Sequence, residues 1–148
     1  MAGIAKLLNG NIFNKSNVKV DLNNKEYQGK TIGLYFSAQW CGPCCEFTPK
    51  LSKFYKTYAE KKNFEIIFMS ADEDEESFND YYKEMPWLKF DFKQQKKKEK
   101  VEEKLEIESY PTLILFDGDS GEVLCADACD KISDEDPKGK DFPWKSDE

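Results

Sequence analysis

The 148-residue sequence contains no histidine and no arginine, so all 22 of its basic residues are lysine. The absence of histidine excludes Ser-His and Cys-His catalytic pairs, a zinc site built on an HExxH motif, and every histidine metal ligand. The absence of arginine excludes bidentate guanidinium clamps on carboxylates or phosphates. Any recognition of anions therefore depends on lysine or on backbone N–H groups.

Long apolar runs are also missing. No segment approaches the length that spans a membrane, and Lys6 and Asn9 interrupt the N-terminal stretch MAGIAKLLNGNIF, which is unlike a signal peptide. Glycine is third and not second, so N-myristoylation is not indicated. The five cysteines are an odd number, which does not suit a secreted disulfide framework. We therefore expect a cytoplasmic protein with no membrane partner.

The chain is long enough for one domain, so we predict that residues 1–148 form a single unit with a charged C-terminal tail from about residue 133. Hydrophobic residues make up 39% and aromatic residues 14%, which is enough for a substantial core. A net charge of −7 disfavours nucleic acid as a partner. The lysine run at 96–98 is accordingly interpreted as a solvated helix face.

Short apolar runs predict three buried strands, at 31–37, 64–70 and 112–116. A fourth strand at 122–126 follows a turn and completes a hairpin. Near the N-terminus, a short apolar helix or turn precedes a second hairpin, in which residues 18–22 alternate as a half-buried strand.

Helical periodicity begins at Gly42, and the apolar positions that carry it are three or four residues apart: Phe47, Leu51, Phe54, Tyr55 and Tyr58. Two further helices are expected, over 72–84, ended by Pro86, and over 96–107. The order of elements predicts an α/β sandwich, with a central mixed β-sheet flanked by α-helices and an N-terminal β-hairpin.

The sequence Cys41-Gly42-Pro43-Cys44 lies where the first buried strand enters this helix. Free N–H groups and the helix dipole stabilise a thiolate at the first cysteine, which we expect at the surface. Cys44 lies one turn later, within disulfide reach and more buried. The motif therefore indicates a redox pair in which Cys41 attacks a substrate disulfide and Cys44 resolves the mixed disulfide. Pro43 suits the first turn, where a missing N–H matters little.

Other interpretations of the cysteines stay open at this point. Cys125 and Cys129 could complete a zinc site with Cys41 and Cys44, or all could simply pack. Cys45 is either a small helix residue or a regulatory thiol near Cys41. Cys125 and Cys129 are ordinary thiols or a secondary disulfide.

Several segments together resemble the thioredoxin fold, and specifically the tryparedoxin and nucleoredoxin branch. The resemblance runs from about residue 6 to 145 and rests on five segments in order: YFSAQWCGPCCEFTPKLSKFY, NFEIIFMSADEDEESF, YYKEMPWL, SYPTLILFDGDSGEV and FPWK. It implies a thioredoxin-like fold and a thiol–disulfide oxidoreductase.

The resemblance also implies roles for matched residues. Cys41 is the expected nucleophile and Cys44 the resolving thiol, and their redox-active disulfide replaces any cofactor. Substrate binding is expected from Trp40, an exposed contact, and from its neighbours Gly42, Pro43, Tyr110 and Pro111. Pro111 is expected to be a cis-proline packed beside the pair, and Pro49 to kink the active-site helix.

The chain also departs from the pattern of the branch, which usually carries WCPPCR. Gly42 and Cys45 replace a proline and the arginine, and Ala71-Asp72 stands where tryparedoxins often have Trp-Asp. These replacements weaken the case for trypanothione. Tyr35 occupies the position of the buried aspartate of thioredoxins, so the proton of Cys44 must pass through water or other neighbouring groups.

The resemblance favours a monomeric protein-disulfide reductase. Its expected clients are protein disulfides such as those of peroxiredoxins, and its electron donor is a low-molecular-weight dithiol, glutathione or a thioredoxin reductase. The alternative is a nucleoredoxin-like module that binds partners in a redox-dependent way through Trp40, Trp87, Trp144 and the acidic segment 72–76. Of these, Trp87 is expected in the core.

Overall fold

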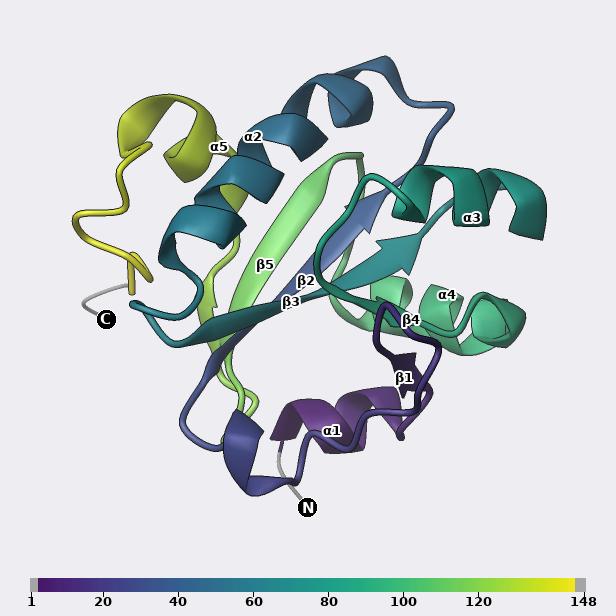
Figure 1. Ribbon diagram of the computed structural model, residues 1–148, viewed down its shortest axis with the longest axis horizontal. Coiled ribbons are helices and arrows are strands. Elements are labelled where there is room, and N and C mark those ends of the chain that lie inside the picture. The colour runs from purple at the N-terminus through teal and green to yellow at the C-terminus, as the bar shows by residue number, and fades with distance from the viewer. Residues whose placement is uncertain (1–2, 146–148) are drawn as a thin grey trace.

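The computed structural model describes residues 3–145, so residues 1–2 and 146–148 of the predicted domain lie outside it. Its strands form one mixed sheet in the order β1-β4-β3-β2-β5-β6 (Figure 1). β2, β3 and β4 are parallel, whereas β1, β5 and β6 run antiparallel to their neighbours. The bounds are β1 Ile12–Phe13, β2 Thr31–Ser37, β3 Phe64–Ser70, β4 Leu88–Phe90, β5 Thr112–Asp117 and β6 Val123–Cys125.

Helices cover both faces of this sheet (Figure 1). α2, α3 and α5 pack on one face, and α1 and α4 on the other. The bounds of the helices and short helical turns are α1 Gly3–Leu8, η1 Lys25–Tyr27, α2 Gly42–Tyr58, α3 Glu75–Tyr82, η2 Phe92–Gln94, α4 Gln95–Lys104, α5 Ala128–Asp130 and η3 Lys131–Glu135. The prediction of an α/β fold with a central mixed sheet and flanking helices is confirmed.

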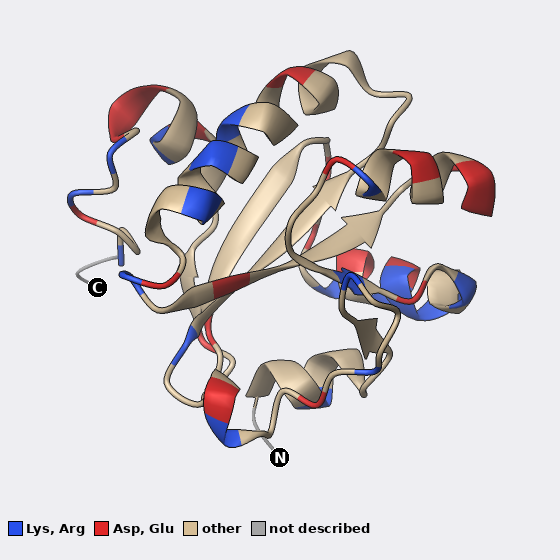
Figure 2. Ribbon diagram, viewed as in Figure 1, with Lys and Arg blue, Asp and Glu red and all other residues tan. Residues whose placement is uncertain are grey.

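The pleat of the central strands divides the core into two parts. Tyr35 of β2 points toward α2 and α3, whereas its neighbours Leu34 and Phe36 point toward α1 and α4. Charged residues lie mainly on helices and loops, and Glu65 is the charged residue within β2 and β3 (Figure 2). The sheet is therefore apolar on both faces, which explains why its strands read as continuous apolar runs.

The helix α2 begins as the sequence predicts. Cys41 is its N-cap, and a proline occupies its first turn. Phe47, Leu51 and Phe54 are buried against the sheet, and each such side chain contributes about 1.5–3 kcal/mol relative to exposure. Pro49 lies inside the helix. These contacts hold the N-terminal end of α2 next to the C-terminal end of β2, a central strand of the sheet.

The predicted N-terminal hairpin is only partly formed, and the strand expected over 18–22 is absent. One isolated bridge joins Phe13 to Lys19. The Asn14 side chain accepts hydrogen bonds from the backbone N–H groups of Ser16 and Val18, which bends the chain away from an extended course. Val18 is 57% exposed as a result. β1 pairs with β4 instead, and no periodicity predicted β4 because it has three residues.

One further prediction needs correction. Lys98, expected on a solvated face, is buried and paired with Glu102. In the charged tail, Trp144 contacts Phe54 and donates a hydrogen bond to Asp136, so part of this segment packs against α2. Within residues 3–145, no helix has the length and apolar character needed to cross a membrane.

Candidate redox centre

The two cysteines of the CGPC motif lie at the junction of β2 and α2. The Cys41 Sγ accepts a hydrogen bond from the backbone N–H of Cys44 at 3.3 Å, which links the first thiol to the first helical turn. Cys41 is 7% exposed and Cys44 is fully buried. Cys44 is the more buried thiol, as predicted, but Cys41 is less accessible than the expected surface position.

The loop before β5 covers Cys41. The bond between Tyr110 and Pro111 is cis, as the resemblance implied. The Cys41 thiol donates a weak hydrogen bond of 3.7 Å to the carbonyl oxygen of Tyr110. The structure therefore brings Cys41 into direct contact with Tyr110, which lies 69 residues later in the sequence.

Trp40 is the exposed aromatic residue beside the thiols, with 59% of its surface exposed. Its indole N–H donates to the carbonyl oxygen of Ala71 at 2.9 Å. Its ring meets the Tyr110 ring edge-on, with centroids 6.0 Å apart and planes at 88°. Gly42 and Pro43 are also exposed, and a Cβ placed on Gly42 would meet no atom within 4 Å. These predicted contact residues form one surface around Cys41.

Comparison with known proteins identifies the family. A model described as thioredoxin-like matches residues 29–123. Tryparedoxin from Trypanosoma brucei brucei is 43% identical over 146 residues, which cover 97% of this chain and 99% of that protein. The chain belongs to the thioredoxin-like family, in its tryparedoxin and nucleoredoxin branch.

Other relatives of this thioredoxin-like chain agree. A solved structure of tryparedoxin from Trypanosoma brucei superposes with a TM-score of 0.92 at 42% identity, covering 99% of this chain and 100% of the other. Human nucleoredoxin is 39% identical over 125 residues, which cover 83% of this chain but 28% of that protein. The tryparedoxins match nearly the full length of this chain and of their own. Because of this match, the chain is identified as a thiol–disulfide oxidoreductase.

This oxidoreductase has a buried hydroxyl cluster beside Cys44, which the sequence did not predict. The Tyr35 hydroxyl lies 2.6 Å from Thr48 Oγ1, and the Tyr81 hydroxyl bonds both Thr48 and Ser37. Burial raises the pKa of Tyr35, and it raises that of Tyr81 to about 12. The cluster therefore stays neutral at physiological pH.

The hydroxyl cluster also affects Cys44, the thiol expected to resolve the mixed disulfide. Burial raises the pKa of Cys44, and the hydrogen bond with Cys41 raises it further. A hydrogen bond from Ser37 opposes part of this increase because it stabilises the thiolate. Cys44 consequently needs a proton acceptor before it can act, and Ser37 is the hydroxyl that assists the charged form.

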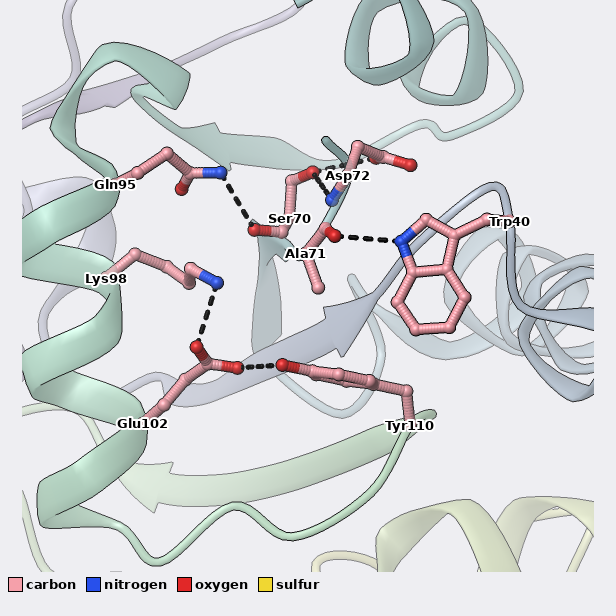
Figure 3. A network of polar contacts seen from close by, with 8 residues as sticks. All are labelled: Trp40, Ser70, Ala71, Asp72, Gln95, Lys98, Glu102 and Tyr110. Atoms are coloured by element: carbon pink, nitrogen blue, oxygen red, sulfur yellow. Dashed lines mark hydrogen bonds and ion pairs between the residues drawn. The ribbon is translucent and has the colours of Figure 1, made fainter. Parts of the chain in front are cut away.

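The role of Asp72 was also not predicted from the sequence. The sequence assigned it to the start of a helix, but α3 begins at Glu75, with Asp74 as its N-cap. Asp72 is 4% exposed and accepts a hydrogen bond from Gln39 N–H at 2.7 Å. It accepts a second hydrogen bond from Ser70 Oγ, also at 2.7 Å (Figure 3). It thus fixes the segment that leads into Trp40 and Cys41. An acidic residue two positions after the end of a buried strand was the signal for this role.

The other three cysteines lie in different surroundings. Cys45 is exposed and its thiol donates to the Gln39 carbonyl oxygen at 3.2 Å. Burial, and then the negative charge of Glu84, raise its pKa. Cys125 donates to Asp127, and burial raises the pKa of Cys125 to about 11 and that of Cys129 to about 12. Among residues 3–145, no three Cys, Asp or Glu side chains are grouped so that they could hold a metal ion.

Proposed function

We propose that the protein reduces protein disulfides by dithiol–disulfide exchange through Cys41 and Cys44. The observation that carries this proposal is the position of the Cys41 Sγ, between the Cys44 N–H and the Tyr110 carbonyl oxygen, beside exposed Trp40. A substrate sulfur can reach Cys41 from this side, whereas Cys44 is shielded.

The exchange has two balanced steps. The Cys41 thiolate attacks one sulfur of the substrate disulfide, a mixed disulfide forms, and the first substrate thiolate leaves. The Cys44 thiolate then attacks the Cys41 sulfur and displaces the second substrate thiolate. Two electrons pass to the substrate, its two thiolates take up the protons that Cys41 and Cys44 released, and a Cys41–Cys44 disulfide remains. An external dithiol, or a reductase, returns this disulfide to the reduced form.

Insulin reduction with a dithiol donor tests the proposal. Cys41→Ser is expected to abolish turnover, and Cys44→Ser to accumulate a mixed disulfide that mass spectrometry detects. The matched control is Cys45→Ser, the adjacent exposed thiol, which is expected to retain turnover. Turnover retained by Cys41→Ser would refute the assignment of the nucleophile.

The electron donor and client are a finer part of the proposal. One tryparedoxin of known structure, with a TM-score of 0.91 and 39% identity, is described as complexed with glutathionylspermidine. This supports a low-molecular-weight thiol as donor, and we propose protein disulfides of the peroxiredoxin type as clients. Reduction kinetics of the oxidised protein with trypanothione, glutathione and a thioredoxin reductase discriminate the donors. A rate with the reductase far above both thiols would contradict a low-molecular-weight donor.

A redox-dependent binding module is the second candidate function. The exposed Trp40 favours it because a large aromatic side chain beside the thiols can contact a partner protein. Trp87, by contrast, is 1% exposed and cannot form part of the predicted contact surface. Trp144 is only partly exposed because it packs on Phe54. Equal capture of a partner by the oxidised and the reduced protein would refute this function.

We further propose that the protein acts as a monomer in the cytoplasm. Across residues 3–145, the exposed large hydrophobic residues are Val18, Trp40 and Val123, which suits a monomer. The odd number of cysteines, one exposed, favours a reducing compartment. Size-exclusion chromatography and cell fractionation test the two statements.

A further inference from the structure

A nearly buried ion pair between Lys98 and Glu102 lies on α4, next to Tyr110 (Figure 3). Lys98 Nζ is 2.8 Å from Glu102 Oε1, and the two side chains are 7% and 14% exposed. Lysine and glutamate are seldom buried unless they are paired, and the loss of hydration offsets much of their attraction. Stability alone therefore does not explain why this pair is here.

The second carboxylate oxygen of Glu102 holds Tyr110 in the loop before β5. The Tyr110 hydroxyl donates a hydrogen bond to Glu102 Oε2. Burial raises the pKa of Tyr110, and the hydrogen bond to Glu102 raises it further, so the hydroxyl stays a donor at neutral pH. The ion pair thus holds the outer end of the Tyr110 ring.

Tyr110 touches the reacting site in two places. Its carbonyl oxygen contacts the Cys41 thiol, and its ring packs edge-on against Trp40. A shift of the Tyr110 ring would therefore disturb the exposed aromatic surface that it forms with Trp40, while the Tyr110 carbonyl stays beside the nucleophile.

α4 is also attached to the other side of this surface (Figure 3). Gln95 donates through Nε2 to the Ser70 carbonyl oxygen at 3.4 Å, directly before the Ala71 carbonyl that holds Trp40. Gln95, Lys98 and Glu102 are spaced by three and four residues, so they share one face of the helix. One face of α4 thereby supports both aromatic rings.

We propose that Glu102, held by Lys98, is a positioning residue that makes Tyr110 specificity-determining for the polypeptide around a substrate disulfide. This inference rests on the proposed function. With its hydroxyl occupied by Glu102, the Tyr110 ring offers an apolar surface in a set orientation next to Trp40. An apolar segment of a protein substrate can bind there without ordering the ring first, whereas a small disulfide does not reach it.

Two variants remove the Tyr110–Glu102 hydrogen bond in different ways. Tyr110→Phe keeps the ring but lacks the hydroxyl. Lys98→Met/Glu102→Leu removes the acceptor and leaves no unpaired charge, a replacement that buried ion pairs tolerate well. Each is expected to raise KM for insulin by about 3- to 10-fold and to leave kcat and the rate with a small aromatic disulfide within about twofold. The triple variant is expected to show the same KM as either alone, because all three lose one interaction.

The matched control is Lys131→Met/Glu135→Leu. This pair has the same i,i+4 spacing and a 3.1 Å contact, but it is more exposed and lies on η3. It is expected to leave both substrates unaffected. An unchanged KM for insulin in both folded test variants would overturn the inference. An equal loss of reduction rate with insulin and with the small disulfide would also overturn it.

A measurement that needs no substrate separates this inference from the proposed function. Time-resolved fluorescence anisotropy is measured with Trp40 present and again after Trp40→Phe in the same background. The difference between the two signals reports the motion of Trp40. Greater mobility in both test variants supports the positioning role, and unchanged mobility in both overturns it. If the native protein fails to reduce insulin, the proposed function fails, and the anisotropy result still decides the role of Glu102.

Discussion

The two candidate thiols lie one helical turn apart, yet the buried polar groups beside them differ in kind. Next to Cys44 the groups are neutral hydroxyls, from Tyr35, Ser37, Thr48 and Tyr81. On the Cys41 side, a charged pair of Lys98 and Glu102 supports Tyr110 from behind. The neutral cluster lies beside a thiol that must lose its proton in the proposed exchange. The charged pair does not touch a thiol; it contacts Tyr110, and Tyr110 contacts Cys41.

The difference has a physical reason. A buried carboxylate beside Cys44 would raise the pKa of that thiol through like-charge repulsion, beyond the increase that burial already causes. Hydroxyl groups can stabilise either protonation state by rotating. A charged pair, in contrast, has one favourable geometry, so it suits a support that must not move. Four predictions test this contrast, in order of decreasing effect.

Breaking the charged pair on one side is expected to have the largest effect. Glu102→Leu leaves the Lys98 ammonium buried without a partner, and we expect a loss of about 3–5 kcal/mol in the free energy of unfolding. Urea denaturation measures it. Lys98→Met/Glu102→Leu is the control and should recover most of the loss. A loss below about 1 kcal/mol in Glu102→Leu would show that the pair is effectively solvated.

The centre of the hydroxyl cluster comes next. Thr48→Val removes the shared partner of two buried tyrosine hydroxyls and is expected to cost about 1–3 kcal/mol of stability. Thr57→Val is a close match because each threonine donates to the carbonyl four residues earlier on the same helix, but Thr57 is exposed. It should change stability by less than about 0.5 kcal/mol. Equal effects in thermal denaturation would contradict a special role for the cluster.

Ser37→Ala tests the influence of the cluster on chemistry. Without the Ser37 hydroxyl, the pKa of Cys44 rises further above its ordinary value, so less thiolate is present at neutral pH. Release of the mixed disulfide should slow by about 2- to 10-fold at pH 7, and the deficit should shrink as pH rises toward the pKa of Cys44. Stopped-flow measurement of substrate release across pH checks this. A deficit independent of pH would refute it.

Cys45 should show the smallest effect. Its side chain is exposed and belongs to neither polar network, so Cys45→Ala should alter the disulfide reduction rate by less than about twofold. Cys45→Arg, which restores the cation usual in the branch, places a positive charge near Cys41. A faster reaction with Cys45→Arg at low salt but not at high salt would identify an electrostatic effect.

Local pattern was sufficient for much of the fold and for the candidate site. The apolar runs of β2, β3 and β5 and the periodicity of α2 predicted these elements closely. The CGPC motif indicated Cys41 and Cys44, because strand ends and helix starts are encoded by neighbouring residues. The expectation for Pro111 came from the family resemblance, since its local pattern marked only the start of a strand. β4 and the course of residues 18–22 were missed, since a three-residue strand and an asparagine-directed turn have no reliable period.

By itself, the sequence determined the thiol chemistry: a dithiol at a strand–helix junction, without histidine, arginine or a thioredoxin-type aspartate. Only the tertiary structure decided what surrounds it. The hydroxyls of Tyr35, Thr48 and Tyr81 meet from three separate elements, and Lys98, read as solvated, is buried beside Glu102 to hold Tyr110. The physical reason is that hydrogen bonds and ion pairs between distant segments depend on how the helices pack against the sheet, and no local pattern in the sequence records that packing.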